Sequence, residues 1–232
     1  MTKLDRMDDL ISHFAARRAA TRARRLDAVG SLLAEFVDRR LSRRDRAGSF
    51  NVLSLFRVAD AEEVHSGFLA WLLDAHESHG CGPLFMETIA RLCGLAIELS
   101  TGYHVRTEFS SHESIIDIMV FRHGDFLMYI ENKVWSPEGR DQLGREHWDM
   151  RRVGHALHVP PDRQVGVFLT PAGQPPTTAD GTPWHVLSYP RLATAFVDLL
   201  PHVQDEKTRL ILADWLKTVT GWTGGMLDAD VF

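Results

Sequence analysis

The 232-residue chain has little cysteine, no long apolar run and no excess of positive charge. Its two cysteines, Cys81 and Cys93, cannot build the multiple disulfides of a small secreted scaffold. No apolar stretch has the length of a membrane-spanning helix, and the first residues lack the apolar region of a signal peptide. These absences predict a cytoplasmic globular protein with no membrane partner.

The formal net charge of −5 at pH 7 is unlike that of most nucleic-acid binders, but it is unevenly distributed. Residues 1–47 contain 12 Lys/Arg and 7 Asp/Glu, whereas the rest of the chain contains 14 and 24. Local charge decides binding more than the total does, and a metal site itself needs surplus carboxylates. The acidic total therefore does not exclude nucleic acid as a partner.

Sequence patterns for several common chemistries are also missing. The chain has no GxxxxGK phosphate-binding loop, no dinucleotide-binding fingerprint and no internal repeat. His76, His79, Cys81 and Cys93 lack the paired spacing of a structural zinc site. Nucleotide-driven and zinc-dependent functions are accordingly not favoured.

The basic N-terminal part is predicted to be a helical extension, residues 1–47, that precedes a domain over residues 48–232. Apolar residues at a spacing of three to four, such as Leu26, Val29 and Leu33, predict one long helix or two over residues 2–46. Arginines occupy the opposite faces. These helices either contact a nucleic-acid backbone or, as we favour, form an amphipathic surface for the domain or a second subunit.

Hydrophobic spacing in the remaining chain predicts an alternation of helices and strands. Helices are expected at about 60–74, 83–93, 139–152, 190–200 and 205–220, and strands at about 102–109, 114–122, 126–134, 165–170 and 184–189. The central order is helix, three strands, helix, strand. This order predicts an α/β domain built on one sheet.

Two of these strands, joined by a turn at residues 123–125, carry charge where a core strand should not. Residues 126–130 are apolar on both faces, which predicts a buried central strand, yet Glu131 and Lys133 follow directly. Side chains alternate along a strand, so Glu131 and Lys133 share one face, and Asp117 on the neighbouring strand can reach it.

Two carboxylates and a lysine beside an apolar sheet are costly unless they pair or hold a metal. Mg²⁺ prefers carboxylate oxygens and retains several waters, and a nearby lysine can orient water or stabilise charge on a phosphate. This combination is suited to metal-assisted hydrolysis of phosphodiesters. The alternative is an ion pair of Lys133 with Glu131 or Asp117 that has no catalytic role.

Asp117, thirteen intervening residues, and Glu131-Asn132-Lys133 resemble the D…(D/E)xK motif of the PD-(D/E)XK nuclease superfamily. The element order is similar to the αβββαβ core of restriction endonucleases, which implies a mixed sheet flanked by helices. Further blocks over residues 50–200 resemble a bacterial branch of this superfamily. They are the E-x-x-H-S-x-F-L-x-W-L-L segment from Glu63, an HGxG-like loop from His79, Asp117-Ile118, residues 130–133, Gln142-Leu143 and residues 169–173.

The resemblance implies a role for each matching residue. Asp117 and Glu131 would bind Mg²⁺ or Mn²⁺, Lys133 would position or activate the attacking water, and Gln142 would support the site. Glu63 would add an acidic metal ligand, or else cap a helix that starts near residue 60.

Glu108, late in the first strand, is a further candidate for the metal site. Its alternative role is that of a surface residue on an edge strand. The basic residue expected just before the Asp-Ile pair is absent, because Ile115 and Ile116 stand there. This difference concerns contacts with the substrate rather than the metal ligands.

The function implied by the resemblance is that of a metal-dependent nuclease, acting on DNA rather than RNA, with a role in bacterial defence or restriction. The alternative is a nuclease-fold subunit that binds nucleic acid, or depends on a partner, without cutting. In either case residues 1–47 are expected to mediate a homodimer or contact with a partner protein.

Overall fold

The computed structural model describes residues 17, 22, 24–40, 50–98 and 102–224. The chain divides into two units, one ending at Phe50 and one beginning at Asn51. In the first unit, residues 24–40 are helical, in agreement with their apolar spacing. The rest of the predicted N-terminal helices lies outside the described residues.

The second unit contains the predicted alternation of helices and strands. Its elements are α2 (Val52–Leu55), α3 (Glu62–Leu73), α4 (Leu84–Leu92), β1 (His104–Ser110), β2 (Ile115–Arg122), β3 (Phe126–Asn132), α5 (Gln142–Ala156), β4 (Gln164–Thr170), β5 (His185–Ser188), α6 (Tyr189–Val197) and α7 (Glu206–Gly221). The main differences from the prediction are at boundaries. Strand β3 ends two residues earlier than expected, and α5 begins three residues later.

The five strands form one mixed sheet in the order β1-β2-β3-β4-β5. Strands β1, β2 and β3 are antiparallel neighbours, while β3, β4 and β5 run parallel. The turn between β2 and β3 is tight, and α5 makes the crossover from β3 to β4 that a parallel pair requires. All seven residues of β3 are buried, which confirms the prediction of a central strand.

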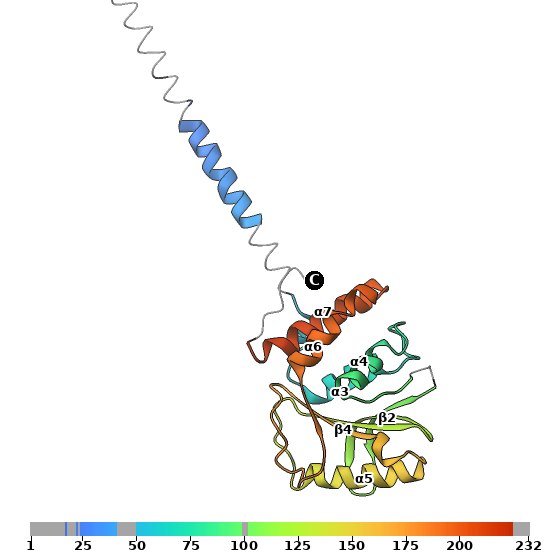
Figure 1. Ribbon diagram of the computed structural model, residues 1–232. Helices are drawn as coiled ribbons and strands as arrows, with labels where there is room; N and C mark the ends of the chain where they lie inside the picture. The colour runs from blue at the N-terminus through green and yellow to red at the C-terminus, as the bar shows by residue number, and fades with distance from the viewer. Residues whose placement is uncertain (1–16, 18–21, 23, 41–49, 99–101, 225–232) are drawn as a thin grey trace, which may run out of the picture. The chain divides into compact units, whose positions relative to one another are not determined.

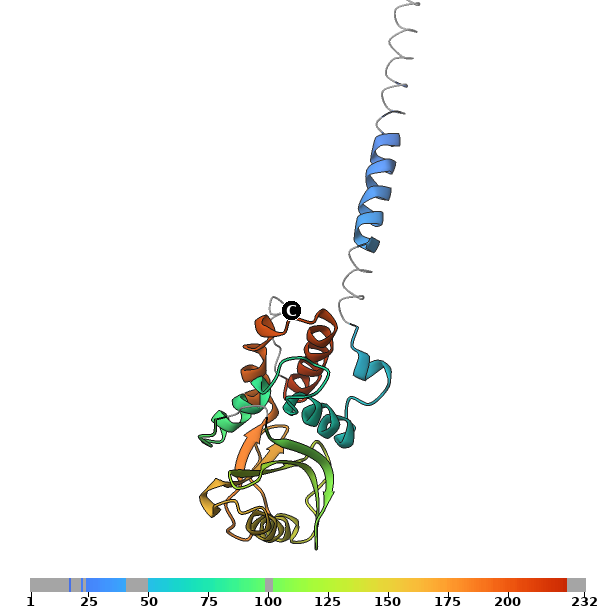
Figure 2. The ribbon, with the colours of Figure 1, turned by 90° about the vertical axis from the view of Figure 1, so that its right-hand side faces the viewer.

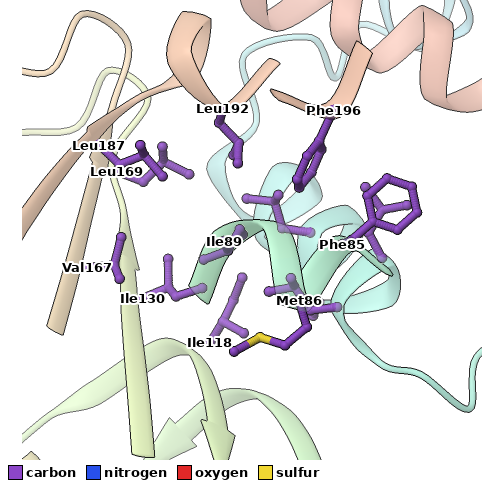
Figure 3. Packing of buried hydrophobic residues seen from close by; sticks show 14 of the residues in the cluster. Phe85, Met86, Ile89, Ile118, Ile130, Val167, Leu169, Leu187, Leu192 and Phe196 are labelled. Atoms are coloured by element: carbon purple, nitrogen blue, oxygen red, sulfur yellow. The ribbon is translucent and has the colours of Figure 1, made fainter. Parts of the chain in front are cut away.

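Helices cover both faces of the sheet (Figure 1). Helices α3, α4, α6 and α7 lie over one face, and their apolar side chains form the larger core with that face. In Figure 3, Met86 and Ile89 of α4 lie close to Ile118 and Ile130 of the central strands, and Phe85 contacts Phe196 of α6. The continuous apolar character of these strands is explained by this double coverage.

The opposite face packs on α5, which Figure 2 shows nearly end-on beneath the sheet. Leu127 and Tyr129 of β3 meet Met150 of α5 in a second, smaller cluster. Because α5 starts beside the end of β3, its first turn lies next to the charged residues that follow the strand.

Helix starts explain one boundary difference. Helix α7 begins after Asp205, whose carboxylate accepts a hydrogen bond from the backbone of Thr208, and such caps can be read from sequence. Helix α3 begins after Ala61 without a side-chain cap. Asp60 is therefore not the cap of α3, and its Oδ1 instead accepts a hydrogen bond from the Trp135 indole (3.2 Å).

Within the part of the chain that the structure describes, no helix combines the length and apolar character needed to cross a membrane.

Candidate active site

The register of the sheet brings Asp117 and Glu131 together. Ile118 of β2 pairs with Ile130 of β3, so the next residue outward on each antiparallel strand lies at the same level. The Asn132 backbone N–H donates a 2.7 Å hydrogen bond to Asp117 Oδ2. The spacing of these two carboxylates is therefore set by a ladder of backbone hydrogen bonds, not by a loop.

Glu131 and Lys133 share a face, as strand alternation predicts. Lys133 Nζ lies 2.8 Å from Glu131 Oε1, and Glu131 is only 1% exposed. The other carboxylate oxygen of Glu131, Oε2, is buried and has no hydrogen-bond partner among the described residues. A buried acceptor of this kind is costly unless something outside the protein chain binds it.

Asn132 points to the opposite face and is completely buried. Its Nδ2 donates to Ser66 Oγ (3.0 Å) and to the Glu62 carbonyl (3.3 Å), and its Oδ1 accepts from Tyr189 Oη (2.7 Å). These bonds attach the end of β3 to α3 and α6. Sequence reasoning assigned no role to Asn132, which holds in place the strand that carries Glu131 and Lys133.

Gln142 links the strand to α5. Its Nε2 donates to Glu131 Oε1 (2.5 Å) and to Glu146 Oε1 (2.8 Å), while its own Oε1 accepts from the Gly139 backbone (2.9 Å). The amide is thus held at both ends. Gln142 therefore lies beside Glu131, next to the candidate site, as the sequence predicts.

Glu146 is a site residue that the sequence analysis missed. It is 1% exposed, and its Oε2 has no hydrogen-bond partner in the described part of the chain. The available signal was its spacing of four residues from Gln142, which places both on one face of a helix. Burial raises the pKa of Glu146 to about 9, and the charge on Glu131 adds to the effect.

Helix α3 brings two further carboxylates to this edge of the sheet. Glu62 accepts hydrogen bonds from the Val134 backbone (2.8 Å) and from Ser136 Oγ, and it lies 3.7 Å from Lys133 Nζ. Glu63 is exposed and lines a pocket of about 310 Å³ together with Asp117.

The predicted capping arrangement places Glu63 third after an N-cap at Asp60, but the N-cap of α3 is Ala61, so Glu63 is the second helical residue. Two acidic residues in the first turn still suit the positive end of the helix dipole.

Glu108 lies on edge strand β1 and lines the same pocket as Glu63 and Asp117. It is exposed, as its alternative role predicts, but its backbone is unusual. Its φ of 46° falls in the left-handed region, which residues other than glycine rarely adopt. Strain of this kind often marks functional positions.

Burial raises the pKa of both central carboxyl groups, Asp117 to about 6 and Glu131 to about 7. The charge of Asp117 adds to the rise at Glu131, whereas Lys133 opposes it. Burial acts to lower the pKa of Lys133, but the carboxylates of Glu131, Glu62 and Asp117 together outweigh burial, and the net shift is upward. Lys133 therefore stays a cation across the neutral range.

The donor set fits a hard divalent cation. Asp117 and Glu131 offer carboxylate oxygens, one of them the unpartnered Oε2 of Glu131. In the described residues, no group of three His, Cys, Asp or Glu side chains is gathered closely enough to hold an ion. Mg²⁺ does not need such a cage, because it is often bound by one or two carboxylates with water and substrate phosphate completing the shell.

Comparison with known proteins identifies the family of the chain. The family model of the PD-(D/E)XK nuclease superfamily matches residues 50–219. No curated protein and no solved structure matches the chain. The matched region contains the whole sheet, Asp117, Glu131 and Lys133, and it covers well over half of the sequence. The chain belongs to the PD-(D/E)XK nuclease superfamily.

Proposed function

We propose that this protein is a metal-dependent nuclease that hydrolyses phosphodiester bonds, in DNA rather than RNA. The observation that carries the proposal is the junction of β2 and β3, where Asp117, Glu131 and Lys133 converge and a buried oxygen of Glu131 has no partner in the described chain. Membership of the superfamily supports the same class of reaction.

Asp117 and Glu131 are the residues that would hold Mg²⁺ or Mn²⁺. When bound, such an ion neutralises phosphate charge and lowers the pKa of water. The two carboxylates must be ionised for this role, and their raised pKa values mean that each is partly protonated near neutral pH in the metal-free protein. Binding of a cation would therefore be accompanied by release of protons.

Lys133 is proposed to act as a fixed positive charge. Its Nζ lies beside Glu131, and its pKa is shifted upward, so it does not give up its proton at neutral pH. This disfavours removal of a proton from water by Lys133 and favours the other expected role, orienting water and stabilising negative charge on the phosphate.

Gln142 is proposed as a positioning residue, because it holds Glu131 Oε1 and thereby fixes the direction of Oε2. Glu63 and Glu108 remain proposed sources of additional oxygen ligands, since both line the pocket that Asp117 enters. Glu62 is already occupied by Val134 and Ser136 and is better placed to support the segment after β3.

The test is cleavage of plasmid, linear duplex, single-stranded DNA and RNA with Mg²⁺, Mn²⁺ or EDTA, using wild type and Lys133→Ala side by side. Cleavage that depends on metal and falls by about 10²–10³-fold in Lys133→Ala is expected. Lys207→Ala is a matched control, because Lys207 is an exposed lysine on α7. Cleavage at the wild-type rate by a folded Lys133→Ala protein would contradict the proposal.

The second candidate is a nuclease-fold subunit that acts only with a partner bound through residues 1–47. One observation favours it: apolar side chains on helical residues 24–40, among them Leu32 (65% exposed) and Phe36 (61% exposed), are not buried within their own unit. Light scattering on the full chain and on residues 48–232 distinguishes the candidates. A monomer in both forms, with full cleavage by the shorter one, would exclude a requirement for this surface.

A further inference from the structure

A second pocket, of about 370 Å³, opens beside Lys133 and shares no lining residue with the pocket of Glu63, Glu108 and Asp117. Phe168 and Thr170 of β4 line it, together with two segments that are far apart in the sequence, residues 134–138 and 171–177. Lys133 belongs to the lining, so the pocket adjoins the candidate active site. We call it the Trp135 pocket.

The two segments that line the Trp135 pocket are tied to each other. The Glu138 carboxylate accepts hydrogen bonds from the backbone N–H and the hydroxyl of both Thr177 and Thr178, at 2.6–3.1 Å. One carboxylate thus connects the segment after β3 to the segment after β4. The pocket is consequently formed in the protein before any ligand arrives.

Trp135 is a large aromatic side chain that is 59% exposed yet held in position. Its indole N–H donates to Asp60 Oδ1 (3.2 Å), and the Trp222 ring meets it at 68° with 6.1 Å between centroids. Exposed tryptophan is uncommon, and an exposed tryptophan fixed by a hydrogen bond and a ring contact is suited to stacking with a flat ligand. It lies two residues after Lys133 in the chain.

Thr170, in contrast, is 4% exposed, and its hydroxyl is without a hydrogen-bond partner in the described part of the chain. A threonine hydroxyl is both a donor and an acceptor. The Trp135 pocket therefore combines an aromatic surface with a buried polar group that has unused hydrogen-bonding capacity, beside a fixed positive charge at Lys133.

We propose that the Trp135 pocket binds an unstacked nucleobase of the nucleotide next to the phosphate that Lys133 contacts. The base would stack on Trp135, and its edge would reach the Thr170 hydroxyl. Bases in a duplex are paired and stacked and cannot enter such a pocket, so the substrate is single-stranded nucleic acid or a single-stranded end. This inference rests on the proposed nuclease function.

The test measures binding by fluorescence anisotropy with Ca²⁺ in place of Mg²⁺. The probes are oligodeoxythymidine and oligouridine of about 16 nucleotides and a DNA duplex of the same length. Trp135→Ala is expected to weaken single-strand binding by about 5- to 100-fold and to leave duplex binding unchanged. Trp135→Phe keeps a stacking surface and should retain most of the affinity.

Two further variants sharpen the result. Thr170→Val has nearly the same shape but lacks the hydroxyl, and it should weaken binding less than Trp135→Ala does, by an amount that differs among bases. Trp148→Ala is the matched control, because Trp148 is a 70% exposed tryptophan on α5 that does not line the pocket, and its binding should equal that of wild type.

A probe with one 2-aminopurine reports stacking directly, independent of affinity. Its fluorescence should fall on binding to wild type and Trp135→Phe, and should stay high at saturating Trp135→Ala. Circular dichroism and thermal melting establish that each variant is folded. If Trp135→Ala does not fold, Trp135→Leu, which is apolar but has no aromatic ring, replaces it and is judged by the same criteria, with Trp135→Phe as its comparison.

The inference is overturned if folded Trp135→Ala binds single strands as wild type does, loses single-strand and duplex binding equally, or still quenches 2-aminopurine. In that case cleavage that depends on Lys133 would leave the proposed function intact. If wild type neither binds nor cuts any nucleic acid, both proposals fail. Oligodeoxyuridine, which differs from oligouridine only in the sugar, identifies the preferred sugar.

Discussion

The two faces of the end of β3 differ in how fully their polar groups are satisfied. On one face, both polar atoms of the Asn132 amide have partners, on α3 and α6. On the other, Glu131 has a buried oxygen with none in the described chain, and Glu146 has another. Neighbouring residues of one strand thus differ: Asn132 is a fully hydrogen-bonded structural group, whereas Glu131 has an unpaired oxygen that we propose binds a cation.

The largest expected effect comes from the unsatisfied face. Glu131→Gln keeps the shape of the side chain but removes the charge needed to hold a cation. We expect the single-turnover rate to fall by about 10²–10³-fold, while the melting temperature in EDTA is equal to or above that of wild type. If a folded Glu131→Gln protein cuts normally, the unpaired oxygen of Glu131 has no role in cleavage, and the proposed functional difference between the two faces is wrong.

The satisfied face should respond in the opposite way. Asn132→Ala leaves the hydroxyl groups of Ser66 and Tyr189 buried without their partner, and it should lower the free energy of unfolding by about 2–4 kcal/mol. Urea denaturation measures this. Gln142→Ala, which removes an amide from the other face, is the comparison variant. It should lower the free energy of unfolding by less than Asn132→Ala does.

Metal binding should depend on pH because the two carboxyl groups that would bind the metal have raised pKa values. The pKa of Asp117 is raised to about 6 and that of Glu131 to about 7, so both carboxyl groups bind protons that compete with a cation. Below pH 6 the affinity for Mn²⁺ should fall by about tenfold or more per pH unit, and above pH 8 it should level off. Titration calorimetry at several pH values checks this; a flat profile would contradict it.

A smaller effect is expected at Glu146. Its folded-state pKa is raised to about 9, so the folded protein holds a proton that the unfolded chain loses near pH 4.5. The contribution of Glu146 to the free energy of unfolding is therefore fully present below about pH 4.5 and is lost as the pH rises toward 9.

In EDTA, Glu146→Gln keeps the hydrogen bond from Gln142 but has no proton to lose. Between low and high pH, its free energy of unfolding should therefore fall by about 1–3 kcal/mol less than that of wild type. Thermal melts of both proteins at pH 5 and pH 8.5 measure the difference. If the melting temperatures of wild type and Glu146→Gln change by the same amount between pH 5 and pH 8.5, the Glu146 carboxyl does not titrate in this range.

Much of the fold could be predicted from the sequence because its signals are local. The fully apolar run of β3 and the tight turn before it predicted a central strand in a hairpin. The alternation of side chains along that strand predicted that Glu131 and Lys133 share one face, and their side chains do meet. Gln142 was predicted from its motif and lies where expected.

What could not be predicted depends on the phase of a helix or on distant segments. Helix α3 has no side-chain cap, so nothing in the sequence fixed its start. Successive residues of a helix are rotated by about 100° around its axis. Glu62 therefore contacts Lys133, whereas Glu63, the residue that we predicted for the site, is exposed.

Glu146 was missed because its burial is created by packing of α5 on the sheet. The Trp135 pocket depends on segments about forty residues apart that are joined by hydrogen bonds to Glu138.

The backbone hydrogen bond from Lys133 to the carbonyl of Leu169 (2.8 Å) has a consequence for protein engineering. Asp117, Glu131 and Lys133 all come from one hairpin, which suggests a short module that could be moved to another scaffold. The direction in which Lys133 leaves the strand is nevertheless fixed by β4, a parallel neighbour that the chain reaches only after α5. The hairpin alone is therefore not a transplantable unit, and at least α5 and β4 would have to accompany it.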